Sequence, residues 1–267
     1  MKLIDIGVNL THPSFNRDRE EVIEAAACAG VSPLIITGTG EKASSEALRF
    51  AAEYSEKKPG ALYATAGVHP HEARFCGERT IETLRELALS YRALAIGECG
   101  LDYNRNFSPQ DVQRKWFEKQ IELAAELSLP LFLHERDASE DFTAILKNCG
   151  ARVQAKVVHC FTGAGAELEK YLDLGCYIGL TGWICDERRG GHLESLVKKI
   201  PPGRIMIETD APFILPRNLP EKVRARRNEP KYLPHIAGTI ARCLGRDPED
   251  FAAETSATTR RFFGIQL

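Results

Sequence analysis

Residues 130–134 read PLFLH and residues 155–159 read AKVVH, and each run passes from apolar side chains directly into a histidine. The runs PLIIT (33–37) and ALAIG (93–97) have the same apolar character. Strands that are apolar at successive positions are typical of a parallel sheet whose two faces are both buried. These four runs therefore predict parallel strands, and the two histidines are expected where their strands end.

Similar runs recur along the whole chain. We predict strands at residues 2–8, 33–37, 62–67, 93–97, 130–134, 156–160, 176–180 and 204–208. Eight strands that alternate with helical segments, without a break in composition, predict an α/β fold in which residues 1–267 form a single (β/α)₈ TIM-barrel domain. An open, doubly wound sheet is the alternative.

The segments between these strands have helical periodicity. Residues 109–128 are the clearest case, with Ser108 expected as the N-cap and Pro109 as the first helical residue. A loop rich in Pro and Arg is expected over residues 212–234, and helices over residues 231–244 and 248–262.

Composition and charge exclude some classes of protein. Apolar residues make up 43% and charged residues 27% of the chain, as in ordinary soluble globular proteins. The net charge of −2 and the pI near 6.4 argue against a protein that coats duplex DNA, although an enzyme can still hold a strand end with a few local cations.

The cysteines and the apolar runs bear on location. None of the eight cysteines falls in a C-x-x-C pair, so we expect free buried thiols in a reducing, cytoplasmic compartment. The N-terminal run MKLIDIGVNL is unlike a signal peptide, and no run is long enough to cross a bilayer, so no membrane partner is expected.

Polar residues with catalytic chemistry follow strand after strand. They are Asn9 after strand 1, His69 and His71 after strand 3, Glu98, Cys99 and Asp102 after strand 4, His134 and Glu135 at the end of strand 5, His159 at the end of strand 6 and Asp210 after strand 8. In a parallel barrel these ends converge on one rim, where barrel enzymes place their active sites.

Glu98, His134 and His159 offer one carboxylate and two imidazoles, which predicts a site for a divalent cation. Asp210 is expected to bind the cation or to take a proton from a water molecule. A single histidine at a strand end is more often a hydrogen-bonded structural residue than a ligand. Four such groups on one rim favour the metal site.

Other residues are candidates for substrate contacts. His69 is expected to contact a phosphate or an attacking water, and His71 to do the same or to form a rigid His-Pro turn. Arg188, Arg189 and Arg227 lie on predicted loops and suit phosphate oxygens, unless they are simply solvated.

Two further residues on these loops are candidates for other roles. Trp183 could stack on a base or pack against the protein. Glu229 is expected to anchor its loop or to cap a helix rather than to react.

At these residues the sequence resembles the TatD family of deoxyribonucleases. The matching motifs are DIGVNL (5–10), ITGT (36–39), TAGVHPHE (65–72), AIGECGLDYNRNF (95–107), LFLHERDA (131–138), VVHCFTG (157–163), YIGLTGWICDERRG (177–190), IETDAPFILPR (207–217), RRNEPKYLPHI (226–236) and FFGI (262–265). They cover the chain nearly end to end. The resemblance implies a metal-dependent hydrolase barrel of the amidohydrolase type, with Glu98, His134 and His159 as metal ligands and Asp210 as ligand or base.

One departure concerns strand 1. Most relatives carry a His-x-His pair there, whereas this chain has Gly7 and Asn9. A second ion would then be left with Asp210, Asn9 and Glu98, an oxygen-rich set that suits Mg²⁺ better than Zn²⁺. Mg²⁺ is the expected cofactor, with Mn²⁺ and Zn²⁺ as alternatives.

The resemblance implies a 3′-5′ exonuclease that acts on single-stranded DNA and RNA, in DNA repair or DNA degradation, and we expect a monomer. Glu98, His69 and Asp210 are the expected catalytic residues, with Asp210 deprotonating the attacking water. One alternative is an amide or ester hydrolase, such as an aminoacyl-tRNA deacylase, but no Lys ends strand 4 or 5. The other alternative is a catalytically inactive barrel that serves as a binding or quality-control protein.

Overall fold

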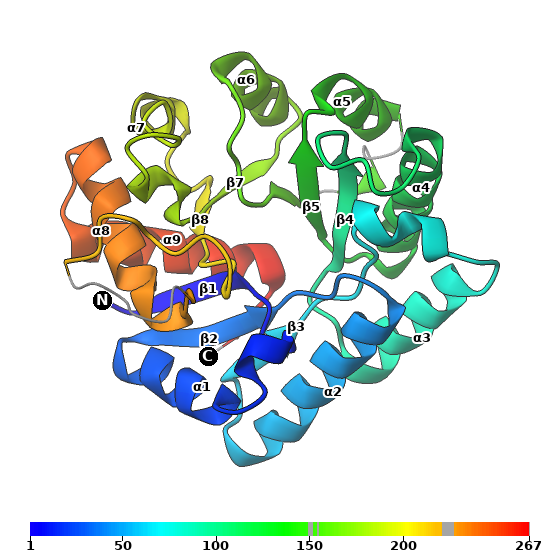
Figure 1. Ribbon diagram of the computed structural model, residues 1–267, viewed down its shortest axis with the longest axis horizontal. Helices are drawn as coiled ribbons and strands as arrows, with labels where there is room; N and C mark the ends of the chain where they lie inside the picture. Colours follow the sequence, from blue (N-terminus) through cyan, green and yellow to red (C-terminus); the bar gives the residue numbers. More distant parts are fainter. Residues whose placement is uncertain (149–151, 154, 221–226, 267) are drawn as a thin grey trace.

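The fold is described by a computed structural model that covers residues 1–148, 152–153, 155–220 and 227–266. Eight parallel strands within these residues surround a central axis (Figure 1). They are β1 (Leu3–Val8), β2 (Val31–Ile36), β3 (Leu62–Ala64), β4 (Ile96–Asp102), β5 (Leu131–Arg136), β6 (Lys156–Val158), β7 (Tyr177–Leu180) and β8 (Ile205–Ile207).

The strands form a closed barrel from two parallel sheets. One sheet has the order β1-β2-β3 and the other the order β4-β5-β6-β7-β8. Isolated parallel bridges, Ala66↔Ile96 and Val8↔Ala211, join the two sheets at both edges. The predicted barrel is therefore confirmed, and the open sheet is wrong.

Helices cover the outside of the strands (Figure 1). The α-helices of the described residues are α1 (Arg19–Cys28), α2 (Glu41–Lys57), α3 (Thr80–Tyr91), α4 (Gln110–Leu127), α5 (Ser139–Asn148), α6 (Gly165–Asp173), α7 (Leu193–Leu196), α8 (Leu233–Leu244) and α9 (Pro248–Phe263). Short 3₁₀ helices are η1 (Pro13–Phe15), η2 (Pro70–Phe75), η4 (Gly182–Cys185), η5 (Val197–Lys199) and η6 (Pro230–Tyr232).

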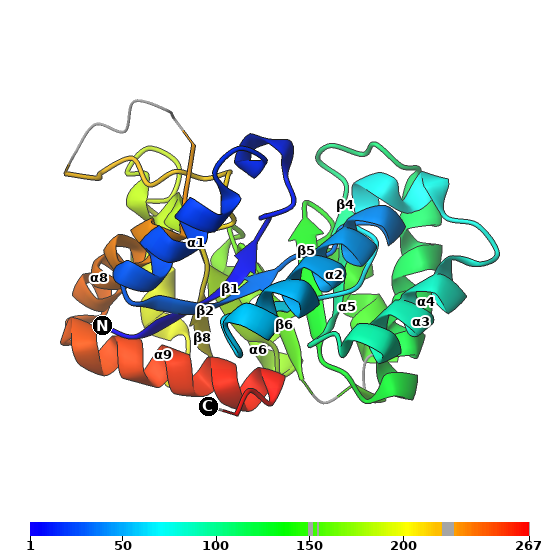
Figure 2. The same ribbon diagram turned by 90° about the horizontal axis from the view of Figure 1, so that it is seen from below.

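A small apolar cluster fills the barrel and closes one of its ends. It consists of Ile6, Ile35, Ala95, Phe132, Val157 and Met206, together with Phe262, Phe263 and Ile265 from the C-terminal segment. Helix α9 lies across this end of the barrel (Figure 2). Since the strand ends that carry the polar residues lie opposite, the apolar cluster leaves that other end for the site.

Strand periodicity links this cluster to the site. Side chains two residues apart in a strand point to the same face. His134 follows the core residue Phe132 by two positions, and His159 follows the core residue Val157 in the same way. Both imidazoles therefore lie directly above the apolar cluster.

The strand ends differ in detail from the prediction. Glu98 and Asp102 lie within β4 rather than after it, because β4 keeps pairing with β5 as far as Asp102↔Arg136. The predicted N-cap at Ser108 is wrong: Pro109 holds the cap position of α4. The Ser108 hydroxyl instead donates to the carbonyl oxygen of His71 at 2.9 Å.

The cysteines of the described residues are free thiols, as expected. Cys99, Cys176 and Cys185 are buried, but Cys28 is exposed on α1, so the prediction of burial is wrong for Cys28. Cys149 lies outside the described residues. Within those residues, no helix combines the length and the hydropathy needed to cross a membrane.

Candidate active site

The C-terminal ends of the strands surround a cleft of about 660 Å³. It is lined by most of the residues that the sequence singled out, namely Asn9, His69, His71, Glu98, His134, His159, Trp183 and Asp210. Residues that are far apart in the chain therefore meet at one rim, as the barrel predicts.

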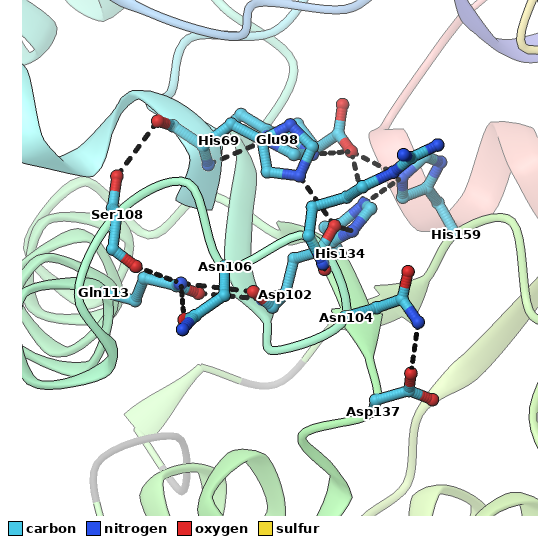
Figure 3. A network of polar contacts seen from close by, with 12 residues as sticks. His69, Glu98, Asp102, Asn104, Asn106, Ser108, Gln113, His134, Asp137 and His159 are labelled. Carbon is cyan, nitrogen blue, oxygen red and sulfur yellow. Dashed lines mark hydrogen bonds and ion pairs between the residues drawn. The ribbon is translucent and has the colours of Figure 1, made fainter.

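Glu98 lies at the centre of this rim, with only 5% of its surface exposed. Its Oε1 atom is 2.7 Å from His159 Nε2, 2.8 Å from His134 Nδ1 and 3.3 Å from His69 Nε2 (Figure 3). Burial raises the pKa of Glu98, but the charges of His159 and His69 and the hydrogen bonds from the imidazoles outweigh it and hold this pKa well below its usual value. The Glu98 carboxylate is therefore ionised at neutral pH.

The donor set at Glu98 fits a divalent cation. His134 Nδ1 and His159 Nε2 are 3.4 Å apart and approach the same carboxylate oxygen. Adjacent ligands at about 2.1 Å from one ion lie roughly 3.0 Å apart in octahedral and roughly 3.4 Å apart in tetrahedral geometry, so one ion could contact both nitrogens. Imidazole nitrogen and carboxylate oxygen are also the ligand types that such ions use in proteins.

His69 is near enough to be considered as another ligand, because ligand atoms of His69, Glu98 and His134 lie within 4.8 Å of one another. Its hydrogen bonds assign it a different role. The backbone N–H of His71 donates to His69 Nδ1 at 3.1 Å, and burial lowers the pKa of His69 to about 4. A neutral ring that accepts at Nδ1 carries its proton on Nε2, so His69 is a hydrogen-bond donor that faces Glu98.

Asp102 is a buried carboxylate to which the sequence assigned no separate role. Its Oδ2 atom is 2.6 Å from His71 Nε2 and 3.5 Å from His134 Nε2. Burial raises the pKa of Asp102, but the nearby His134 imidazole and the hydrogen bond from His71 outweigh it and lower this pKa. An ionised Asp102 favours the His134 tautomer with its proton on Nε2, which leaves Nδ1 free to bind a cation.

A sequence signal for Asp102 exists. Asp102 lies four positions after Glu98 in β4, so a regular strand places both side chains on the same face. The strand-end rule alone does not use this spacing.

Asp210 faces the site from the side of β1 and β8. Its Oδ1 atom accepts a hydrogen bond from Asn9 Nδ2 at 3.0 Å, and the described residues donate none to Oδ2. Burial and the negative charges of Glu98 and Glu208 raise the pKa of Asp210 to about 7, against the opposing effect of His159. A carboxylate with a pKa near neutrality suits general-base chemistry.

The backbone at Asp210 is constrained as well. Its φ of 53° lies in the left-handed region, which residues other than glycine seldom adopt. The Asp210 N–H donates to the carbonyl oxygen of Gly7 at 2.9 Å, which connects the loop after β8 to β1.

The structure does not place Arg227 in the cleft. Its guanidinium donates to both carboxylate oxygens of Asp18, at 2.9 and 2.6 Å, and to Glu229 at 2.8 Å. Glu229 anchors the loop, as predicted, since it also pairs with Lys231 at 2.7 Å. Residues 224–226 of the predicted arginine-rich loop lie outside the described residues.

The other two predicted arginines also lie outside the cleft. Arg188 is 3.7 Å from Asp186, and the Arg189 guanidinium is 5.8 Å from the ring centroid of Trp183. Both side chains therefore contact groups of their own loop.

Arg105 and Arg136 line the cleft instead, and both are exposed. Neither guanidinium pairs with a carboxylate of the described residues. The strand-end rule would have found both, because Arg136 ends β5 and Arg105 follows β4 closely.

Two aromatic side chains line the cleft. Trp183 is partly buried and packs against the core, so both interpretations of this residue keep support. Phe213, which the sequence analysis missed, is 49% exposed, and its ring lies 5.4 Å from that of His12. Its position three residues after Asp210 was the available signal.

The sequence matches the family model of the TatD related DNases over residues 4–264. The chain belongs to the TatD family. Relatives within it are named 3′-5′ ssDNA/RNA exonuclease TatD. The one in Erwinia tasmaniensis is 49% identical over 98% of this chain and 100% of that protein, and the one in Rahnella sp. is 48% identical over 98% of each.

Solved structures of similar shape agree with this assignment. A TatD-family hydrolase of Entamoeba histolytica has a TM-score of 0.89 and 27% identity, over 98% of each chain. An amidohydrolase of Saccharomyces cerevisiae has a TM-score of 0.88 over 98% of this chain and 99% of that one, and at 24% identity it shows the fold alone. The predicted TatD family, the metal-dependent hydrolase barrel and the nuclease class are confirmed.

Proposed function

We propose that this TatD-family protein removes nucleotides from the 3′ end of single-stranded DNA and RNA, with Mg²⁺ as its cation. The observation that carries the proposal is the convergence of His134 Nδ1 and His159 Nε2 on Glu98 Oε1 in an open cleft. The names of relatives that are 48 to 49% identical supply the direction and the substrates.

Glu98, His134 and His159 would hold the cation. A divalent cation bound there offsets charge on the phosphate and lowers the pKa of a water molecule. Asp210 and Asn9 add oxygen atoms on the opposite side of the rim, which would suit a second, more weakly held Mg²⁺.

Asp210 acts as the general base in this proposal. The hydrogen bond from Asn9 to Oδ1 fixes the carboxylate and leaves Oδ2 to accept a proton from the attacking water. Burial raises the pKa of Asp210 above its usual value, which makes its carboxylate a stronger proton acceptor. The Nε2–H group of His69 donates a hydrogen bond to Glu98, or to a phosphate oxygen that lies beside the His69 ring.

The rest of the cleft would hold the strand. Arg105 and Arg136, whose guanidiniums pair with no carboxylate of the described residues, offer them to the phosphates. Phe213 and Trp183 offer rings on which bases can stack without sequence preference. Residues 1–267 act in this proposal as one monomeric domain, and the free thiols support a cytoplasmic location.

The first test is degradation of a 5′-labelled single-stranded DNA oligonucleotide in Mg²⁺, with a single-stranded RNA in parallel. The expected result is a ladder that shortens from the 3′ end and disappears with EDTA and in Glu98→Ala. Absence of cleavage with Mg²⁺, Mn²⁺ and Zn²⁺ on both substrates would contradict the proposal. Amide and ester substrates, such as an aminoacyl-tRNA, would then be tried.

A further inference from the structure

Glu208 is a fully buried carboxylate that immediately follows β8. It lies two residues after Met206 of the barrel core, and therefore points into the barrel. A Cβ atom on Gly7 would lie 2.3 Å from Glu208 Oε2, and a Cβ on Gly179 would lie 2.9 Å from Oε1. The Glu208 carboxylate thus fills the volume that a side chain at position 7 would take.

The two oxygens of Glu208 have different surroundings. Oε1 accepts the backbone N–H of Cys160 at 2.6 Å. Oε2 is buried and has no hydrogen-bond partner among the described residues. It lies 3.4 Å from His159 Nδ1, which is also buried and has no partner within that part of the chain. The other nitrogen of the same ring, His159 Nε2, lies 2.7 Å from Glu98 Oε1.

We propose that Glu208 is a positioning residue: it keeps the proton of His159 on Nδ1, so that Nε2 presents its lone pair to the cation site. Glu208 thereby fixes the tautomer of His159, as Asp102 fixes that of His134. The inference rests on the proposed function in one respect, since it takes His159 as a cation ligand. Carboxylates that hold the second nitrogen of a ligand histidine fix both its tautomer and its orientation.

Glu208 does not act as a ligand of the same cation. It does not line the cleft, and its contact with His159 is to the ring nitrogen opposite the one that meets Glu98. Its effect on the cation therefore passes through the His159 ring.

The test is Mn²⁺ affinity, measured by calorimetry on the full chain without substrate, for wild type and Glu208→Gln. Cys160 N–H keeps the amide oxygen of the glutamine on its side, so the amide NH₂ faces His159 Nδ1. That NH₂ favours the tautomer with the proton on Nε2, and we expect Mn²⁺ affinity to fall by about 10- to 100-fold.

Glu229→Gln is the matched control. Glu229 is a partly buried carboxylate outside the cleft lining, and its oxygens pair with Arg227 and Lys231, not with an imidazole. Removal of this charge should leave Mn²⁺ affinity within about threefold of wild type, because no hydrogen bond to a ligand histidine is lost.

A second variant, Gly7→Ala, separates loss of the positioning contact from a general disturbance of the fold. The new methyl group would displace Glu208 Oε2, so it should also weaken Mn²⁺ binding, but add little in a Glu208→Gln background. Unchanged affinity in Glu208→Gln, or fully additive losses, would overturn the inference. If Glu208→Gln does not fold, Gly7→Ala decides alone, and unchanged affinity in that variant overturns the inference.

These outcomes differ from failure of the proposed function. Wild type that binds Mn²⁺ in a Glu98-dependent manner but degrades no nucleic acid contradicts only the exonuclease, whereas the Glu208 comparison still stands. Wild type that binds no Mn²⁺ overturns both.

Discussion

Buried acids on the two sides of the barrel mouth have pKa values that are shifted in opposite directions. The imidazole side consists of His69, His71, His134 and His159 with Glu98 and Asp102. Its two acids have lowered pKa values. On the oxygen side, which is Asp5, Asn9, Thr209 and Asp210, burial raises the pKa of Asp5 to about 8 and that of Asp210 to about 7.

Burial is the largest single influence on all four acids, so the partners decide the outcome. Imidazoles that can carry positive charge reverse the effect of burial on Glu98 and Asp102. Asn9 and Thr209 offer only neutral donors to Asp210 and Asp5. The charge of His159 lowers the pKa of Asp210, but the charges of Glu98 and Glu208 oppose it, so the effect of burial remains. One side is thus prepared to bind a cation, and the other to accept a proton.

The largest expected effect tests this division of roles. Asp210→Asn keeps the oxygen that accepts from Asn9 but removes the proton acceptor. We expect turnover to fall by about a thousandfold or more, since positioned acid–base groups contribute about 10²- to 10⁴-fold. Single-turnover degradation of labelled oligonucleotide measures the loss.

The same variant should leave the imidazole side intact. Mn²⁺ affinity of the Glu98 site should stay within a few-fold of wild type, because no ligand there is altered. Turnover equal to wild type would rule out Asp210 as the base, and loss of the tighter Mn²⁺ site would make Asp210 a ligand instead.

Asp102→Asn tests the imidazole side itself. Removal of the charge facing His71 Nε2 and His134 Nε2 takes away the group that fixes the proton of His134. We expect metal affinity and activity to fall together by about 10- to 100-fold. Added Mn²⁺ should restore part of the activity, whereas a defect that saturating metal does not relieve would point to a role in the chemical step.

A smaller effect is expected from Phe213→Ala. Phe213 is exposed in the cleft on the oxygen side, and a stacked base contributes about 1–3 kcal/mol. KM for oligonucleotides should rise by about tenfold, whereas Mn²⁺ affinity should not change. Phe75, at 66% exposure and outside the cleft lining, provides the matched Phe75→Ala control, and equal KM values in the two variants would contradict stacking at Phe213.

The last prediction concerns stability rather than turnover or binding. The folded-state pKa of Asp5, about 8, exceeds the ordinary aspartate value of 3.8, so the contribution of Asp5 to stability is full below pH 3.8 and is lost as pH rises towards 8. Asp5→Asn should remove this loss. Relative to wild type, the variant should gain up to about 1.4 kcal/mol of unfolding free energy per pH unit in that window, the slope for one proton.

Urea unfolding at pH 5 and at pH 8 measures that difference. A gain that is the same at both pH values would show that Asp5 is ionised in the folded protein. Activity is not part of this comparison, because Asp5 contacts Thr209, the neighbour of Asp210.

Apolar strands and the residues at their ends were enough to predict the barrel and the meeting of Glu98, His134, His159 and Asp210. The arginines were harder, because Arg227 pairs with Asp18, more than two hundred residues away in the chain. Charge in a loop says nothing about such a distant partner. Glu208 was missed because strand-end position was considered without the alternation that places it above Met206.

The two edges at which the sheets join have a consequence for heating. Among the described residues, each edge has one isolated bridge, Ala66↔Ile96 or Val8↔Ala211, and two or three backbone hydrogen bonds. Local opening of a fold begins where backbone pairing is sparse. Glu98, His134 and His159 come from β4, β5 and β6 of one continuous sheet, whereas the Asn9–Asp210 contact crosses an edge. We therefore expect warming to separate Asp210 from Asn9 before it disturbs the residues that would hold the cation. Activity should then disappear at a lower temperature than bound metal does, and amide hydrogens at these edges should exchange with solvent first.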